Sequence, residues 1–376
     1  ARAARAAQAI AAVMKPGELL LGRGEGAVAH ALWLAAAAGA MGQGAQVLDA
    51  GVCAVPQLRH AQRALRCGGA ALVDEGGILP LNEQGARLLI RQQRAVAALN
   101  ARQDYAAPFS GGAREIVDAT QGELAYVADA AARFRADPNL APPVALYAEE
   151  APLLALAERA FLRAGLRVRA ERDPARMALA PGEIGVCLTG GGEGFSLADE
   201  SGALDDGLQQ LLIAWTALES GQQTLVLPVQ ATRAVQRLAE DRGARTEYVA
   251  GESALWMNTL AQRWPEQFVL QFDGIAGALS ALDALTRAGL TLESWRRGMP
   301  AVSRRSRSVP VPPAQTGRVL HALARQEAHV ELGGGLRLKR DDGWAWVCPD
   351  EGRPEFRIVA EAASAETARE LCDFCE

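Results

Sequence analysis

Patterns typical of helices and of strands alternate through the first third of the chain, and this alternation restricts the possible folds more than any other feature of the sequence. Helical patterns cover 1–14, 27–40 and 56–66, and strand patterns cover 18–22, 46–50 and 70–74. Short glycine-containing joints connect them. Alternation of this kind predicts a parallel sheet with helices on its faces.

The same alternation recurs twice. A second unit has strand patterns near 144–148, 167–170, 185–188 and 195–198, with a helix at 151–164. A third has strands near 224–228 and 247–249, with helices at 232–242 and 277–288. Three similar α/β units predict repeated domains.

The tail differs from these units. The serine, arginine and proline content of 304–313 indicates a linker. After it come strand patterns at 329–332, 336–339, 344–347 and 356–360, and a helix at 365–374. Short strands followed by one helix predict a small, mainly antiparallel α+β domain.

Composition narrows the function. The 376 residues are 49% hydrophobic and 22% charged, which predicts several packed cores. The net charge is −5 and the basic residues are scattered, so we expect no nucleic-acid partner. The longest apolar stretch, 27–41, is too short and alanine-rich to span a membrane, so we expect a soluble protein.

Cysteine usage and the first residues bear on location. Six cysteines in a chain of this length are too sparse for a disulfide framework and favour a reducing cytoplasm. Cys372 and Cys375 form a lone C-x-x-C, for which a redox or zinc role is the minor alternative. Segment 1–13 is typical of an amphipathic helix and faintly resembles a transit peptide, and whether residues precede Ala1 stays open.

Five segments in chain order resemble the motifs of the α-D-phosphohexomutase superfamily, the phosphoglucomutases and phosphomannomutases. They are Gly22-Arg23, Val47-Leu48-Asp49-Ala50-Gly51 with Val55-Pro56, Asp199-Glu200-Ser201-Gly202, Asp273-Gly274-Ile275 and Phe356-Arg357-Ile358-Val359-Ala360-Glu361-Ala362. The resemblance implies three α/β domains with mixed sheets at 1–119, 120–204 and 205–312, followed by a small α+β domain at 313–376.

The resemblance also implies a phosphoserine loop, which is altered here. Asp74 and Glu75 fall at the nucleophile positions, and no serine or threonine occurs before Ser110. Asp74 as an acyl-phosphate carrier, or either acid as an imitation of phosphoserine, is an alternative to the favoured interpretation, a solvated acidic turn.

The metal loop that the resemblance implies has lost most of its carboxylates. Its three aspartates correspond to the stretch with Thr189, Gly191 and Glu193, of which only Glu193 is acidic. Because Mg²⁺ needs several anionic oxygens, we expect no tight metal site and no cofactor. Mg²⁺ is expected only if the chain is an active enzyme.

The remaining residues of the implied site bind substrate in the family. Glu266 corresponds to the sugar-reading glutamate, although the apolar run after it favours an ordinary buried strand. In the phosphate loop, Cys348 replaces an arginine and Asp350 and Glu351 add negative charge, which leaves Arg353 and Arg357 as anion-binding candidates.

Arg23 is the fourth substrate-binding candidate. It also lies in Gly22-Arg23-Gly24-Glu25-Gly26, which resembles a dinucleotide fingerprint with the wrong spacing. We therefore expect a phosphohexomutase-like protein without mutase turnover that acts by binding, structure or regulation. Its partners would be a sugar phosphate or other anion, a second copy or another protein. An active family enzyme with altered chemistry and a nucleotide-binding protein are the alternatives.

Overall fold

The structure is a computed structural model that describes the chain except residues 1, 16, 104–114, 174–177, 250–252, 301–302, 327–328, 333–334, 341–342 and 351–352. It divides into two compact units, neither of which is continuous in sequence. Unit 1 comprises Ala1–Ala203 and Met257–Glu293, and unit 2 comprises Leu204–Trp256 and Ser294–Glu376. The boundaries of the four expected domains stay predictions.

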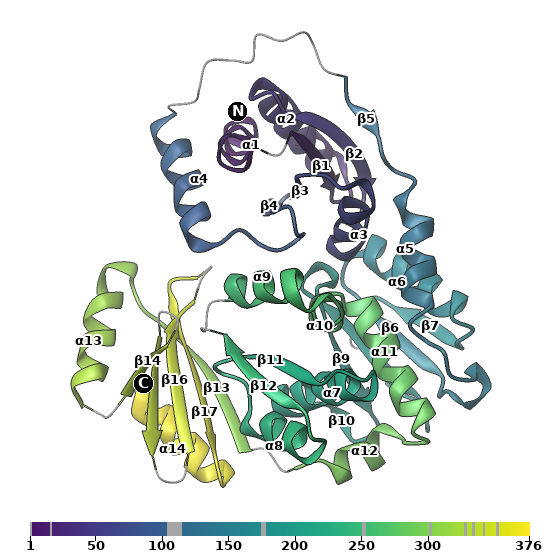
Figure 1. The fold of residues 1–376 in the computed structure, drawn as a ribbon, viewed down its shortest axis with the longest axis vertical. Helices are drawn as coiled ribbons and strands as arrows, with labels where there is room; N and C mark the ends of the chain where they lie inside the picture. The colour runs from purple at the N-terminus through teal and green to yellow at the C-terminus, as the bar shows by residue number, and fades with distance from the viewer. Residues whose placement is uncertain are drawn as a thin grey trace. The chain divides into compact units, whose positions relative to one another are not determined.

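Unit 1 begins with a five-stranded sheet in the order β4-β3-β1-β2-β5 (Figure 1). Its strands are β1 (Glu18–Arg23), β2 (Gln46–Val52), β3 (Gly69–Asp74), β4 (Gly77–Leu81) and β5 (Val117–Asp118). Only β4 runs antiparallel to its neighbour. The accompanying helices are α1 (Arg2–Met14), α2 (Ala27–Gly42), α3 (Val55–Leu65) and α4 (Ile90–Arg102). Consecutive apolar residues in β1 serve two cores, because both faces of this sheet are covered.

The second sheet of unit 1 has the order β10-β9-β8-β6-β7. Its strands are β6 (Val144–Tyr147), β7 (Val168–Glu171), β8 (Ile184–Thr189), β9 (Gly194–Asp199) and β10 (Gly202–Ala203). The helical elements of this part are α5 (Gly122–Ala131), η1 (Pro138–Leu140), α6 (Ala151–Arg163), η3 (Gly190–Gly192), α10 (Pro265–Phe272) and α11 (Gly274–Arg287). Parallel and antiparallel pairs occur together, so the expected mixed sheets are confirmed.

Unit 2 contains the parallel pair β11 (Thr224–Pro228) and β12 (Arg245–Val249), with α7 (Asp206–Glu219) and α8 (Arg233–Asp241). α9 (Ser253–Arg263) and α12 (Leu292–Gly298) are each divided between the two units. An antiparallel sheet follows in the order β13-β17-β16-β15-β14. Its elements are β13 (Ser303–Pro310), η4 (Pro313–Gln315), α13 (Thr316–Gln326), β14 (His329–Leu332), β15 (Gly335–Arg340), β16 (Gly343–Pro349), β17 (Glu355–Ala362) and α14 (Ala365–Cys375). The expected α+β tail is confirmed.

Two local predictions were wrong. The proposed linker at 304–313 is mostly the edge strand β13, which pairs with β17 along its whole length. Its serines and arginines are largely exposed, as an edge strand allows. The strand predicted after Glu266 is instead helix α10, which has Pro265 in its first turn and brings the Phe268 and Phe272 rings to 5.5 Å. Proline suits the first helical turn, where its missing N–H costs nothing.

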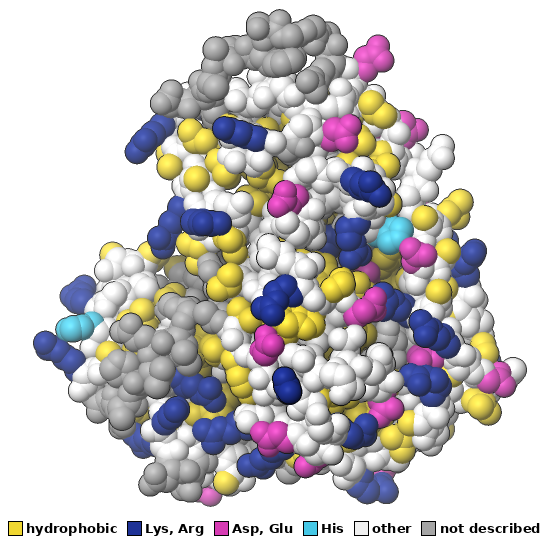
Figure 2. Space-filling model, viewed as in Figure 1, with side chains coloured by type: hydrophobic (Ala, Val, Ile, Leu, Met, Phe, Trp, Pro, Cys, Tyr) yellow, Lys and Arg dark blue, Asp and Glu magenta, His cyan; other side chains and the backbone are white. Residues whose placement is uncertain are grey.

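The surface charges are mixed. In Figure 2, Lys and Arg side chains are interspersed with Asp and Glu side chains over the visible face. Among the described residues, no single helix has the length and apolar character needed to cross a membrane. α10 and α11 satisfy that test only as a pair bent by 100°.

Candidate functional site

Three glycines shape the loop between β8 and β9 in unit 1. Gly190, Gly191 and Gly192 have φ angles of 59°, 64° and 92°, a region that favours glycine. Gly192 also packs tightly, since a Cβ there would lie 2.8 Å from a methyl carbon of Leu153. This tight turn places the next residue, Glu193, inside the protein with 7% of its surface exposed.

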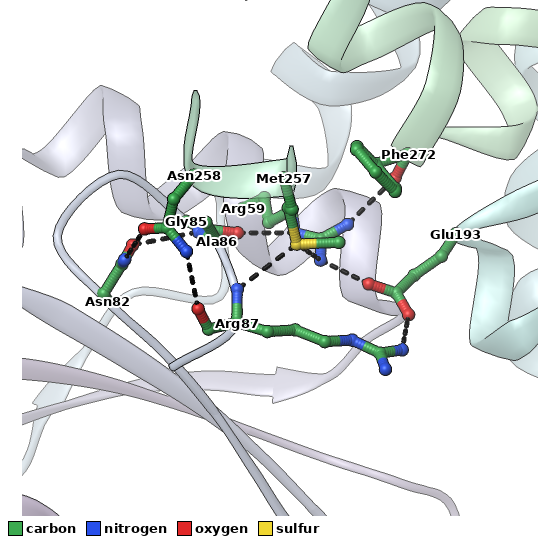
Figure 3. Close-up of polar contacts among 9 residues, drawn as sticks. All are labelled: Arg59, Asn82, Gly85, Ala86, Arg87, Glu193, Met257, Asn258 and Phe272. Carbon is green, nitrogen blue, oxygen red and sulfur yellow. Dashed lines mark hydrogen bonds and ion pairs between the residues drawn. The ribbon is translucent and has the colours of Figure 1, made fainter. Parts of the chain in front are cut away.

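Glu193 forms a buried ion-pair cluster with two arginines (Figure 3). One carboxylate oxygen contacts Nη2 of Arg59, and the other contacts Nη2 of Arg87. The Arg59 side chain is 2% exposed, whereas that of Arg87 is 42% exposed. Two guanidinium groups on one carboxylate leave the cluster with a net charge of +1.

Hydrogen bonds and a ring contact hold the Arg59 side chain in place. It projects from α3, and its Nε donates to the carbonyl oxygen of Gly85 at 2.7 Å while Nη1 donates to that of Phe272 at 2.9 Å. Its guanidinium lies 5.5 Å from the centre of the Phe268 ring and contacts the sulfur of Met257 at 3.7 Å. Burial lowers the pKa of Arg59, and the nearby Glu193 carboxylate opposes that shift.

Hydrogen bonds from a neighbouring turn position Arg87. Asn82 Oδ1 accepts from the backbone N–H of Gln84 and of Ala86, each at 3.0 Å. The Asn82 amide also donates to Asn258, whose Nδ2 donates to the carbonyl oxygen of Arg87 at 2.9 Å. Figure 3 shows these side chains converging on the segment that carries Arg87. These hydrogen bonds hold the backbone of Arg87 in the position from which its side chain reaches Glu193.

These donors do not fit a divalent cation. Both oxygens of Glu193 are already bonded to guanidinium groups, and a dication there would face two positive charges. Thr189 Oγ1 lies over Gly194, 2.8 Å from where a Cβ on that glycine would be. Gly191 could offer only backbone groups. Among the described residues, no cluster of three His, Cys, Asp or Glu could hold a metal ion.

Comparison with known proteins supports one family. Residues 1–74 match the family model described as phosphoglucomutase/phosphomannomutase, alpha/beta/alpha domain I. Over 211 residues the chain is 23% identical to a phosphoglucosamine mutase of Methanococcus aeolicus, a match that covers 50% of this chain and 46% of that protein. The matched region therefore spans about half the length of this curated relative.

Solved structures extend the likeness to nearly the whole chain. A phosphoglucomutase/phosphomannomutase family protein from Burkholderia thailandensis has a TM-score of 0.77 at 16% identity, over 99% of this chain and 91% of that one. A putative phosphomannomutase from Thermus thermophilus has a TM-score of 0.73 at 17% identity, over 99% and 93%. The chain is therefore similar to the phosphoglucomutase/phosphomannomutase family in sequence over residues 1–74, and its fold is similar to that of the two solved proteins over nearly its whole length. At these identities the structural likeness concerns the fold alone.

Asp74 and Glu75, the residues predicted at nucleophile positions, lie in an exposed turn. Asp74 ends β3, and its Oδ1 accepts from the backbone N–H of Gly77 at 2.9 Å, which closes the turn into β4. Glu75 is exposed in the same turn. The segment after Arg23 lies beside it, because Gly24 donates to the carbonyl oxygen of Val73 at 2.9 Å. Arg23 and Asp74 thus come from neighbouring strand ends.

The other predicted residues have contacts of their own within each unit. Glu266 is on α10 and forms an ion pair with Arg133 rather than joining the Glu193 cluster. Arg353 and Arg357 belong to unit 2, where both are exposed. The backbone N–H of Arg353 donates to Asp350 Oδ1 at 2.9 Å. Glu351, which was expected to repel phosphate, lies outside the described residues.

Sequence reasoning identified Glu193 but missed Arg59 and Arg87. These arginines are 134 and 106 residues away from Glu193 along the chain, and neither belongs to a recognisable motif. The one available signal was chemical. Glu193 is a lone carboxylate between a glycine turn and a buried strand. If such a carboxylate is buried, it needs a cationic partner.

Proposed function

We propose that this phosphohexomutase-superfamily chain does not turn over hexose phosphates and acts by binding, structure or regulation. The observation that carries the proposal is the pairing of Glu193 with Arg59 and Arg87. The only carboxylate at the metal-loop positions is neutralised by the protein's own cations. A metal ion that would polarise a phosphoryl oxygen has no anionic ligands left to bind there.

The turn at Asp74 and Glu75 supports the same conclusion. Asp74 is engaged in closing the turn, and no general base among the described residues is bonded to either acid. Family chemistry needs an activated hydroxyl nucleophile, and the sequence has no serine or threonine before Ser110. The acidic turn is proposed as a structural feature of the β3–β4 connection.

An assay of phosphoglucomutase activity tests the proposal. The purified chain is incubated with glucose 1-phosphate, Mg²⁺ and a bisphosphate primer, and formation of glucose 6-phosphate is followed. We expect the rate to equal that of the Asp74→Ala/Glu75→Ala double variant. A wild-type rate clearly above that of the double variant would refute the absence of turnover.

A measurement of Mg²⁺ binding tests the proposal independently of the activity assay. Thermal unfolding is measured with and without MgCl₂ for the wild type and for Glu193→Gln. We expect no rise in Tm for either protein, since a ligand raises Tm only by binding the folded state. A Mg²⁺-dependent rise in the wild type that disappears in Glu193→Gln would restore the metal site and the enzyme hypothesis.

The ligand that we propose for the family site is a sugar phosphate or related anion, bound without metal through exposed arginines such as Arg353 and Arg357. One structure of similar fold is an N-acetylphosphoglucosamine mutase from Aspergillus fumigatus in complex with GlcNAc-6P and magnesium, with a TM-score of 0.56, 14% identity, and coverage of 96% and 76% of the two chains. Loss of glucose 6-phosphate binding in Arg353→Ala/Arg357→Ala would support this ligand. Unchanged binding would exclude these residues.

The proposed location is the cytoplasm. All six cysteines are free, and four are buried, which suits a reducing compartment. Cys372 and Cys375 lie buried on α14 with no disulfide between them. Fractionation of the cells that produce the chain tests this location.

A further inference from the structure

A pocket of about 560 Å³ in unit 1 is lined by residues of α3, α5 and the α10–α11 junction. Its polar lining consists of His60, Arg63, Asp129, Arg133, Glu266 and Asp273, together with Tyr126. Neither Glu193 nor its two arginines line it. A pocket of this size holds a small metabolite.

One wall carries a histidine with an unused ring nitrogen. His60 Nε2 lies 2.7 Å from Asp129 Oδ2, and its ring meets the Tyr126 ring edge-on at 5.6 Å. An ionised Asp129 accepts the proton of Nε2, which leaves Nδ1 of a neutral ring as an acceptor. This Nδ1 is buried and has no hydrogen-bond partner. A buried polar atom without a partner is uncommon, and Nδ1 keeps its capacity to accept a hydrogen bond from a ligand group.

The two arginines that line the pocket differ in whether they already have an ion-pair partner. Arg133 is already paired with Glu266. Arg63 is exposed, and its side chain makes no hydrogen bond or ion pair with any described residue, although its charge acts on Asp273 and Tyr126. Arg63 is therefore the cation of this pocket that remains available to an incoming anion.

Two buried residues of the lining, Tyr126 and Asp273, leave hydrogen-bond acceptors at the pocket. Tyr126 donates its hydroxyl proton to Asp273 Oδ1 at 2.8 Å, and the backbone N–H of Ala276 donates to the same oxygen at 3.0 Å. The Tyr126 hydroxyl therefore already donates its single proton, and its oxygen can still accept hydrogen bonds. Together with His60 Nδ1, these acceptors suit ligand groups that donate hydrogen bonds, such as hydroxyls.

We infer that this pocket binds a small hydroxylated anion, a phosphate ester or a carboxylate, with the anionic group at Arg63 and hydroxyl groups directed to His60 and Tyr126. The inference goes beyond the proposed absence of turnover and does not depend on it. It places a ligand site on the side of α3 that carries His60 and Arg63, separate from the Glu193 cluster.

Isothermal titration of the full chain tests the site. The probes are glycerol 3-phosphate and gluconate, which represent the two anion types, and neutral sorbitol. We expect one or both anions to bind and sorbitol not to bind. Arg63→Ala should weaken the binding by about tenfold or more, because a charge-assisted hydrogen bond is lost. The control Arg163→Ala removes an exposed arginine from the end of α6, outside the pocket, and should leave affinity unchanged.

A second readout locates the ligand. In protein labelled with ¹⁵N-histidine, the His60 Nδ1 resonance, assigned with His60→Gln, should shift on addition of the binding anion. A response only to glycerol 3-phosphate or only to gluconate identifies the anion type. The inference is overturned if neither anion binds up to about 10 mM. It is also overturned if Arg63→Ala binds as tightly as the wild type, or if the His60 resonance does not move.

Discussion

Gly274, the first residue of α11, packs directly against the backbone of Gly194. A Cβ on Gly274 would lie 2.3 Å from the carbonyl oxygen of Gly194 and 3.0 Å from that of Gly192. The start of α11 and the loop that carries Glu193 therefore meet backbone to backbone. No side chain can adjust to relieve an added atom at this contact.

Gly274→Ala should consequently destabilise unit 1. We expect the free energy of unfolding to fall by about 1–3 kcal/mol, as is usual when atoms are forced into a packed interior. Urea denaturation measures the change. The control is Gly317→Ala in α13, where a Cβ meets nothing within 4 Å and helix propensity favours alanine by roughly 0.5–1 kcal/mol. Equal stability of Gly274→Ala and the wild type would show that the contact is looser than described.

The two arginines of the Glu193 cluster should contribute unequally to the free energy of unfolding. Arg59→Ala leaves a buried carboxylate short of a partner and should cost about 3–5 kcal/mol. Arg87→Ala should cost less, about 1–2 kcal/mol, because water reaches its half-exposed side chain. Chemical denaturation compares both with Arg94→Ala, an exposed arginine of α4. Similar losses for Arg59→Ala and Arg87→Ala would contradict this ranking.

The buried carboxyl of Asp273 should make stability depend on pH. Burial raises its pKa, against the opposing effect of its hydrogen bonds from Ala276 and Tyr126. Between the unfolded and the raised folded pKa, the folded state binds more protons, so the contribution of this group to stability falls as pH rises. Asp273→Asn keeps an oxygen acceptor and removes that loss.

The stability of Asp273→Asn relative to the wild type should therefore increase as pH rises from about 4, near the ordinary pKa of Asp. Urea denaturation at a series of pH values measures the difference. Asp241→Asn, at an exposed position in α8, should show no such trend. A constant or shrinking advantage for Asp273→Asn would contradict the raised pKa of Asp273.

Cys53 should resist alkylation in the folded chain. It is 6% exposed, and burial raises the pKa of its thiol to about 12, so almost no thiolate is present at pH 8. Timed treatment with iodoacetamide followed by mass spectrometry should show modification of Cys53 only after denaturant is added. The half-buried Cys348 serves as the internal comparison and should react first. Rapid labelling of native Cys53 would indicate local opening around β2.

Local patterns predicted most of the sheets, because apolar runs between glycine turns are strong signals for strands. They failed at 265–270, where a short apolar run is compatible with either a helix or a strand, and at β13, where pairing with β17 overrides a polar composition. The site was predicted only in part. The assignment of Glu193 to a metal-loop position stays a prediction, and its arginine partners depend on contacts between distant segments that spacing cannot reveal.

The interleaving of the two units along the sequence has a consequence for synthesis. Residues 257–293 complete unit 1, yet they leave the ribosome only after 204–256, which belong to unit 2. Until then, Arg59 in the nascent chain lacks the carbonyl acceptor of Phe272. Unit 1 therefore cannot complete its folding before part of unit 2 has been synthesised. Its apolar surfaces need protection while translation continues.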